Sequence, residues 1–113
     1  MQAHTLTLAV CYAMSLVARL KFEEAKELLR KTTPVARRFL GESHELTLRM
    51  RSLYAKALYY DEGATLDDIR EAVTKLEDAE RIARRVLGRA HPDAVAIKEQ
   101  LRLTREALRF REE

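Results

Sequence analysis

The sequence predicts an all-α fold, an α-solenoid of stacked antiparallel helical hairpins with about five helices. Glycine and proline are scarce, with three and two residues among 113, so few positions interrupt regular structure. The chain is otherwise rich in Ala, Leu, Glu, Lys and Arg, which favour helices, and no run alternates with a strand's period of two. The phrase Arg-Arg-x-Leu-Gly-x-x-His occurs twice, beginning at Arg37 and again 47 residues later at Arg84.

The helices are expected at about residues 4–19, 22–40, 45–60, 66–87 and 92–111. Gly41 and Gly88 follow leucines at the ends of the second and fourth segments, where a left-handed C-terminal cap favours a residue without a Cβ. Gly63 marks the turn between the third and fourth segments.

Start signals support the later helices. Thr65 with Asp68 three residues on predicts a capping box, which places the start of the fourth helix near residue 66. Pro92 fits the first position of the last helix, where its missing N–H costs nothing. Pro34 lies inside the second segment, and we expect it to kink that helix or split it after Thr33.

The repetition extends beyond the shared phrase. Residues 21–41 align without gaps on residues 68–88, and residues 5–13 align on residues 47–55. Because one such unit cannot bury its apolar face alone, stacking of units is expected to build the core. We expect one domain over residues 1–113, with repeat one at about 4–41, repeat two at about 44–88 and a half repeat or C-terminal cap helix at about 91–111.

These units resemble the tetratricopeptide repeat in its longer, kinesin-light-chain-like version. The similarity rests on Tyr12-Ala13, on "FEEA" from Phe22, and on the junctions "LGESHELTL" and "LGRAHPDAV". The first junction has Glu45 where the family has proline. The resemblance implies an α-solenoid that binds peptides or proteins in a concave groove and has no catalytic residues.

The first helix of each hairpin lines the groove in that family. Helical spacing along the third segment then places five side chains on one stripe: Arg49, Ser52, Lys56, Tyr59 and Tyr60. Two cations and two phenols suit an acidic or phosphorylated peptide. The alternative is that the tyrosines pack on the next hairpin and the cations are only solvated.

The first segment is apolar around most of its circumference, which is typical of a helix buried on more than one side. We expect an exposed self-association patch of Leu6, Val10, Met14 and Val17. Such a patch indicates either a homo-oligomer formed through this helix or a fragment of a longer repeat array. The single cysteine, Cys11, is expected to pack as a small hydrophobe.

Other classes of function are disfavoured. The net charge of +3 comes from interleaved basic and acidic residues, which argues against a nucleic-acid-binding solenoid, although two arginine-rich stretches favour one. No catalytic constellation or cofactor motif is present, and His44 and His91 are expected to be loop or cap residues that share no metal ion. The apolar run of residues 6–17 is too short to cross a membrane, and the expected location is cytoplasmic.

Overall fold

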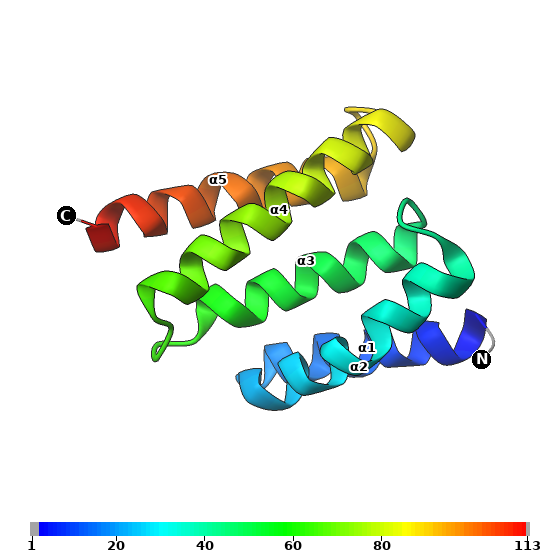
Figure 1. Ribbon diagram of the computed structural model, residues 1–113, viewed down its shortest axis with the longest axis horizontal. Helices are drawn as coiled ribbons and strands as arrows, with labels where there is room; N and C mark the ends of the chain where they lie inside the picture. Colours follow the sequence, from blue (N-terminus) through cyan, green and yellow to red (C-terminus); the bar gives the residue numbers. More distant parts are fainter. Residues whose placement is uncertain (1–2, 113) are drawn as a thin grey trace.

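The computed structural model describes residues 3–112 and is all α-helical over that range. Its helices are α1 (Ala3–Ala18), α2 (Phe22–Leu40), α3 (Glu45–Tyr60), α4 (Leu66–Val86) and α5 (Pro92–Glu112) (Figure 1). The predicted all-α fold and the five helices are confirmed, with bounds that agree to within one residue. Within the described range, no helix combines the length and apolar character needed to span a bilayer.

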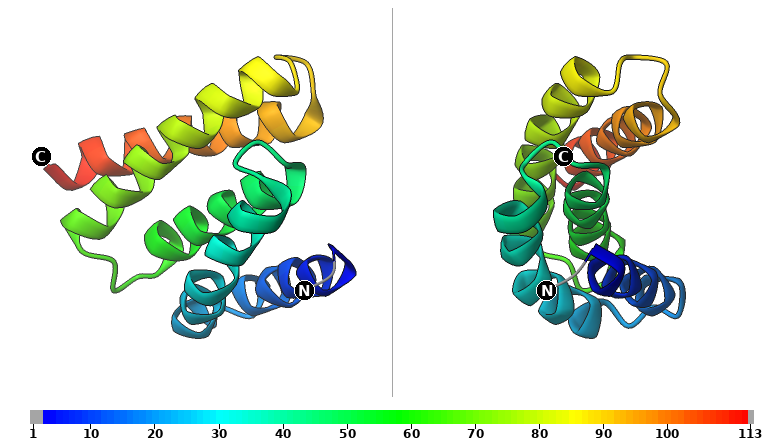
Figure 2. Two further views of the ribbon diagram at one scale, coloured as in Figure 1. Left: turned by 45° about the vertical axis from the view of Figure 1, so that its right-hand side comes forward. Right: turned by 90° about the vertical axis from the view of Figure 1, so that its right-hand side faces the viewer.

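The helices form two layers. Figure 2 (right) shows α1, α3 and α5 on one side and α2 and α4 on the other, with α3 set back between α1 and α5. Each helix packs against the next in the chain, and α3 also contacts α1 and α5. Among the described residues, the backbones of α1 and α2 do not closely approach those of α4 and α5. The arrangement is therefore open, and the first hairpin is joined to the rest of the molecule through α3.

The core repeats with the sequence. Leu29 of α2 and Leu76 of α4, which align in the repeat, are both 0% exposed. Small residues lie where helices approach closely, and the aligned pair Ala25 and Ala72 is also fully buried. Helix α3 contributes to all three clusters of buried side chains, so it is the centre of the packing.

The predicted capping box of α4 is confirmed, and Gly41 and Gly88 both have positive φ, although Gly41 lies outside the left-handed helical region that was expected. The Thr65 hydroxyl accepts from the Asp68 backbone N–H at 3.1 Å, and the Asp68 carboxylate accepts from the Thr65 N–H at 3.0 Å. Gly41 ends α2 with φ 96° and ψ 162°, a region almost restricted to glycine, and Gly88 has φ 93°. Both glycines therefore have the positive φ that the sequence predicts.

Pro34 does not split α2. The helix runs without a break from Phe22 to Leu40 with Pro34 inside it, so the expected division after Thr33 is wrong. Proline removes a single donor from the intrahelical ladder. Packing of the α2 apolar face on α1 and α3 outweighs that loss, since Leu29 and Ala36 on either side are fully buried.

The exposure expected along α1 is largely wrong. Leu6, Val10 and Val17 are only 1%, 3% and 6% exposed, because they pack against α2 and α3, and Met14 alone of the expected patch is exposed. Cys11, expected to be packed, is exposed. Leu8 and Tyr12 are the other large apolar side chains of α1 that are exposed.

Candidate functional site

The inner layer carries a groove of about 220 Å³ between α1, α3 and α5. Helix α3 forms its floor and the other two helices form its walls, in agreement with the recessed position of α3 in Figure 2. Side chains from all three helices line it: Val10 and Met14 of α1, Arg49, Ser52, Leu53 and Lys56 of α3, and Asp93, Ala96, Ile97 and Gln100 of α5. The lining is apolar towards α1 and polar along α3 and α5.

Two hydrogen bonds join α3 to α5 within the groove. The Ser52 hydroxyl donates to Oε1 of Gln100 at 3.1 Å, and the Gln100 amide donates to the Ser52 carbonyl oxygen at 2.8 Å. Because these polar groups already satisfy one another, they fix the spacing of the two helices and leave recognition to the charged side chains at either end.

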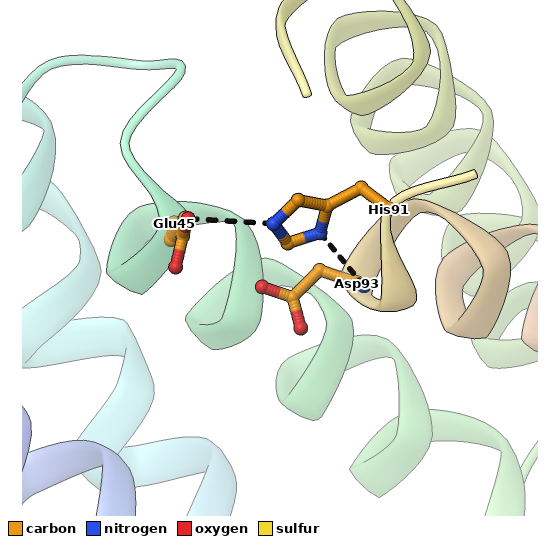
Figure 3. Close-up of side chains that lie close together, drawn as sticks. All are labelled: Glu45, His91 and Asp93. Atoms are coloured by element: carbon orange, nitrogen blue, oxygen red, sulfur yellow. Dashed lines mark hydrogen bonds and ion pairs between the residues drawn. The ribbon is translucent and has the colours of Figure 1, made fainter. Parts of the chain in front are cut away.

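One end of the groove is formed by the N-termini of α3 and α5. Arg49 approaches Asp93 with 3.4 Å between Nη2 and Oδ2, and its side chain remains 50% exposed. Next to this pair, Nε2 of His91 lies 3.5 Å from Oε1 of Glu45 (Figure 3). Acidic groups at helix N-termini are favoured by the helix dipole. This end therefore combines two acids with one partly accessible guanidinium.

Glu45, His91 and Asp93 bring one potential metal-ligand atom each to within 4.8 Å of one another. However, Nδ1 of His91 accepts the backbone N–H of Asp93 at 3.1 Å (Figure 3). An accepting Nδ1 leaves the proton of a neutral imidazole on Nε2, which then faces Glu45 as a donor. A metal ion on Nε2 would displace that proton to Nδ1 and break the cap, so the geometry favours a bridge between α3 and α5.

The equivalent histidine of the first junction has the same local role. Nδ1 of His44 accepts the backbone N–H of Leu46 at 3.1 Å, at the N-cap of α3. His44 and His91 are therefore cap residues, as the sequence predicts. The contact of His91 with Glu45 was not predicted from the sequence. Alignment shows that the two Leu-Gly-x-x-His junctions are equivalent, but it does not show that they lie side by side in the fold.

The other end of the groove contains Lys56, whose Nζ lies 5.0 Å from the centroid of the Tyr60 ring. Tyr60 is exposed and packs edge-to-face on Tyr59, with 4.7 Å between the centroids. Tyr59 is half-buried against the cluster formed with α4 and α5, and burial raises the pKa of its hydroxyl. A cation–π contact holds Lys56 towards this rim.

The structure brings three of the five expected groove residues into one lining: Arg49, Ser52 and Lys56. Tyr59 and Tyr60 do not line the groove, and Tyr59 packs between helices as the alternative interpretation has it. The contributions of α1 and α5 were not anticipated. Val10 and Met14, expected at a self-association patch, instead form a groove wall.

Comparisons with known proteins add no assignment. No protein-family model matches the chain, and neither the curated proteins nor the solved structures contain a significant match.

Proposed function

We propose that this protein is an interaction scaffold that binds an extended, acidic segment of a partner protein in the groove between α1, α3 and α5. The resemblance of its sequence to tetratricopeptide repeats supports this role, because the first helix of each hairpin lines the peptide-binding face in that family. The two-layer order of the helices agrees with such an array. The role requires no catalytic residue, metal ion or cofactor.

The observation that carries the proposal is the placement of two cations on α3 at the two ends of a groove that also contains apolar side chains. Arg49 and Lys56 are seven positions apart on α3, so they lie about 10 Å apart along its axis. The apolar side chains of the groove come from all three helices and include Val10, Met14, Leu53 and Ile97. A polyproline-type segment advances about 9 Å in three residues. Carboxylates at positions i and i+3 therefore match both cations, while a side chain between them covers the floor.

Both cations are available to a ligand. The Arg49 side chain is 50% exposed, although its partner Asp93 is only 19% exposed, so the open side of the guanidinium can accept a ligand carboxylate beside Asp93. Lys56 has a ring contact with Tyr60 and no carboxylate partner among the described residues. An acidic segment would thus gain charge-assisted hydrogen bonds at both ends of the groove.

Selection of a random peptide library on the immobilised protein tests the proposal. We expect enrichment of peptides with acidic side chains three positions apart around an apolar residue. The selected peptides should bind the Arg49→Ala, Lys56→Ala double variant at least about tenfold more weakly, because two charge-assisted bonds are lost. Lys31→Ala, Arg38→Ala removes the same charge from exposed positions of α2 outside the groove. Equal binding by the parent and the groove variant would contradict the assignment.

A second candidate function is self-association through α1, and the exposed side of that helix is the observation that favours it. Leu8 and Tyr12 are 65% and 58% exposed and lie one turn apart. The neighbouring edge of the molecule is acidic, whereas the far edge is basic. The acidic edge includes Glu23, Glu24 and Glu27 of α2 beside Lys31, and the basic edge includes Lys98, Arg102, Arg105 and Arg109 of α5 beside Glu80 and Glu99. These edges are complementary, which favours a head-to-tail contact between two copies.

Sedimentation equilibrium distinguishes this candidate. The Leu8→Glu, Tyr12→Glu double variant is expected to be monomeric at concentrations where the parent associates. Met14→Glu is the control, because Met14 is exposed but faces the groove. Val10→Glu is unsuitable as a test of self-association, because Val10 is only 3% exposed and a buried charge there would unfold the helix. A parent chain that remains monomeric at every concentration contradicts self-association.

A further inference from the structure

A second hollow, of about 160 Å³, lies between the outer helices α2 and α4 and over α3. Within the described range the backbones of α2 and α4 do not approach each other closely, and side chains of α3 line the space between them. Four cationic side chains line the hollow: Arg30, Arg37, Arg51 and Lys75. No carboxylate belongs to its described lining. A cavity with this lining is electropositive.

Tyr54 of α3 holds two of these cations near each other. Cζ of Arg30 lies 5.7 Å from the centroid of the Tyr54 ring, and Nε of Arg30 donates to the Tyr54 hydroxyl at 3.3 Å. Nζ of Lys75, which comes from α4, lies 5.5 Å from the same centroid. The ring stabilises each cation, but their like charges repel. The Lys75 ammonium also lies 3.9 Å from Oε2 of Glu71, one turn earlier on α4.

Arg51 is the buried member of the set. Its side chain is 9% exposed, and Nη1 lies 3.3 Å from Oε2 of Glu42. The other oxygen of the same carboxylate lies 3.3 Å from Nε of Arg37, so one exposed acid at the rim serves two guanidinium groups. Burial and the nearby Arg37 lower the pKa of Arg51. Glu42, which Arg51 shares with Arg37, and the Asp78 carboxylate both attract Arg51 electrostatically, but burial and the charge of Arg37 outweigh them.

Thr33 adds a neutral donor. Its hydroxyl oxygen is buried in the wall of the hollow and has no hydrogen-bond partner among the described residues. An unsatisfied buried hydroxyl is costly, and an acceptor inside the hollow would remove that cost. The wall thus presents a hydroxyl donor beside the cations of α2, α3 and α4.

We infer that this hollow is a binding site for a phosphate group. A phosphate monoester carries about −1.5 to −2 charges at pH 7 and three acceptor oxygens. Guanidinium groups match these oxygens in geometry, and the ammonium and hydroxyl add single donors. A carboxylate ligand would offset less charge and reach fewer donors. The inference does not depend on the groove, which opens on the other layer of helices.

An NMR titration with inorganic phosphate tests the inference. We expect saturable shifts in the backbone amide resonances of Thr33, Arg51, Tyr54 and Lys75 that sodium chloride at equal ionic strength does not cause. The Arg30→Gln, Lys75→Gln double variant should bind phosphate at least about tenfold more weakly, because two charge-assisted contacts are lost. Shifts spread over all basic surfaces, or the same shifts with chloride, would overturn the inference.

The matched control is Arg38→Gln, Arg85→Gln, which removes the same charge from exposed positions of α2 and α4 outside the hollow. It should bind phosphate within about twofold of the parent, since distant surface charges are screened. Thr33→Val removes the hydroxyl at nearly constant volume and should weaken binding without lowering the melting temperature. A control that weakens binding as much as the hollow variant, or unchanged affinity in Thr33→Val and the hollow variant, counts against the site.

The source of the phosphate group is distinguished by two further ligands, a short phosphoserine peptide and its unphosphorylated copy. Tighter binding of the phosphopeptide than of inorganic phosphate would assign the site to a phosphorylated protein segment, and equal affinities would assign it to free phosphate or a small ester. Both results support the inference. Equal binding of the phosphorylated and unphosphorylated peptides contradicts it.

Discussion

Ser52 of α3 and Gln100 of α5 hold each other by two reciprocal hydrogen bonds, one between their side chains and one from the Gln100 amide to the Ser52 carbonyl oxygen. Helices α3 and α5 each pack closely against α4 and share few other contacts with each other. The two bonds are therefore a large part of their direct connection. They set the width of the groove. Loss of this link should therefore affect both stability and binding.

Gln100→Ala is expected to lower the free energy of unfolding by about 1–3 kcal/mol, since two hydrogen bonds are lost and the partly buried Ser52 hydroxyl is left without its acceptor. Urea unfolding followed by circular dichroism measures the change. Lys98→Ala, at an exposed position two residues earlier on the same helix, should change stability by less than about 0.5 kcal/mol. A similar loss of unfolding free energy in both variants would show that the Ser52–Gln100 bonds do not contribute to stability.

Gly41→Ala is expected to destabilise the protein by about 1–3 kcal/mol through backbone strain alone. A Cβ at Gly41 meets nothing within 4 Å, so steric overlap does not contribute, whereas its φ of 96° disfavours every other residue. Gly63→Ala provides the comparison, because its φ lies outside the left-handed region and its nearest neighbour is the Asp61 carboxylate at 3.5 Å. Thermal unfolding should show a clear drop for Gly41→Ala and little change for Gly63→Ala.

The capping box at the start of α4 should make stability depend on pH. The backbone N–H of Thr65 lowers the pKa of Asp68 in the folded state. Because the folded pKa lies below the unfolded value of about 3.9, this stabilisation is complete above that value and is lost as the pH falls through the folded pKa. Asp68→Asn keeps an acceptor but carries no charge, so its unfolding free energy should decline less on acidification below about pH 5.

Thr65→Ala tests the other half of the box and should cost about 1 kcal/mol at neutral pH, whereas Thr65→Ser should cost much less because it keeps the hydroxyl. Urea unfolding at several pH values measures both effects. An acid response of Asp68→Asn equal to that of the parent would mean that other carboxylates dominate the pH dependence.

Cys11 should react with a thiol reagent in the native protein without denaturant, because its side chain is exposed on α1. The rate of modification is measured by the absorbance of the released chromophore. If α1 mediates self-association, the rate should fall as the protein concentration rises, since Cys11 lies between Leu8 and Tyr12 in the helix. A native thiol that reacts only after unfolding would contradict the exposure of this face.

The helices were predictable because the signals that define them are local. The Thr65 capping box, Pro92 and the glycines at positions 41 and 88 fix the helix ends through nearest neighbours, and the structure has those ends. Of the two outcomes expected at Pro34, a kink or a split, the split does not occur, because the cost of one lost hydrogen bond is visible in sequence, whereas the packing that outweighs it is not.

The sites were harder to predict because they combine residues from several helices. Arg49 and Lys56 could be identified from spacing along one helix, but the roles of Met14 and Gln100 depend on how α1 and α5 lie beside α3. An apolar helix such as α1 shows no preferred face in its sequence, so the buried positions could not be distinguished from the exposed ones. The basic hollow likewise joins an arginine-rich stretch of α2 to Lys75, whose proximity comes only from the fold.

The attachment of the first hairpin to the rest of the molecule through α3 alone has a consequence for how the protein opens. Release of α1 and α2 leaves every contact among α3, α4 and α5 in place, so partial unfolding from that end is an accessible excursion. Deuterium would then enter the amides of α1 before those of α3. Unfolding of this hairpin would also remove the α1 wall of the groove and the α2 wall of the basic hollow. Ligand binding at either site would therefore favour the folded hairpin and so strengthen binding at the other site.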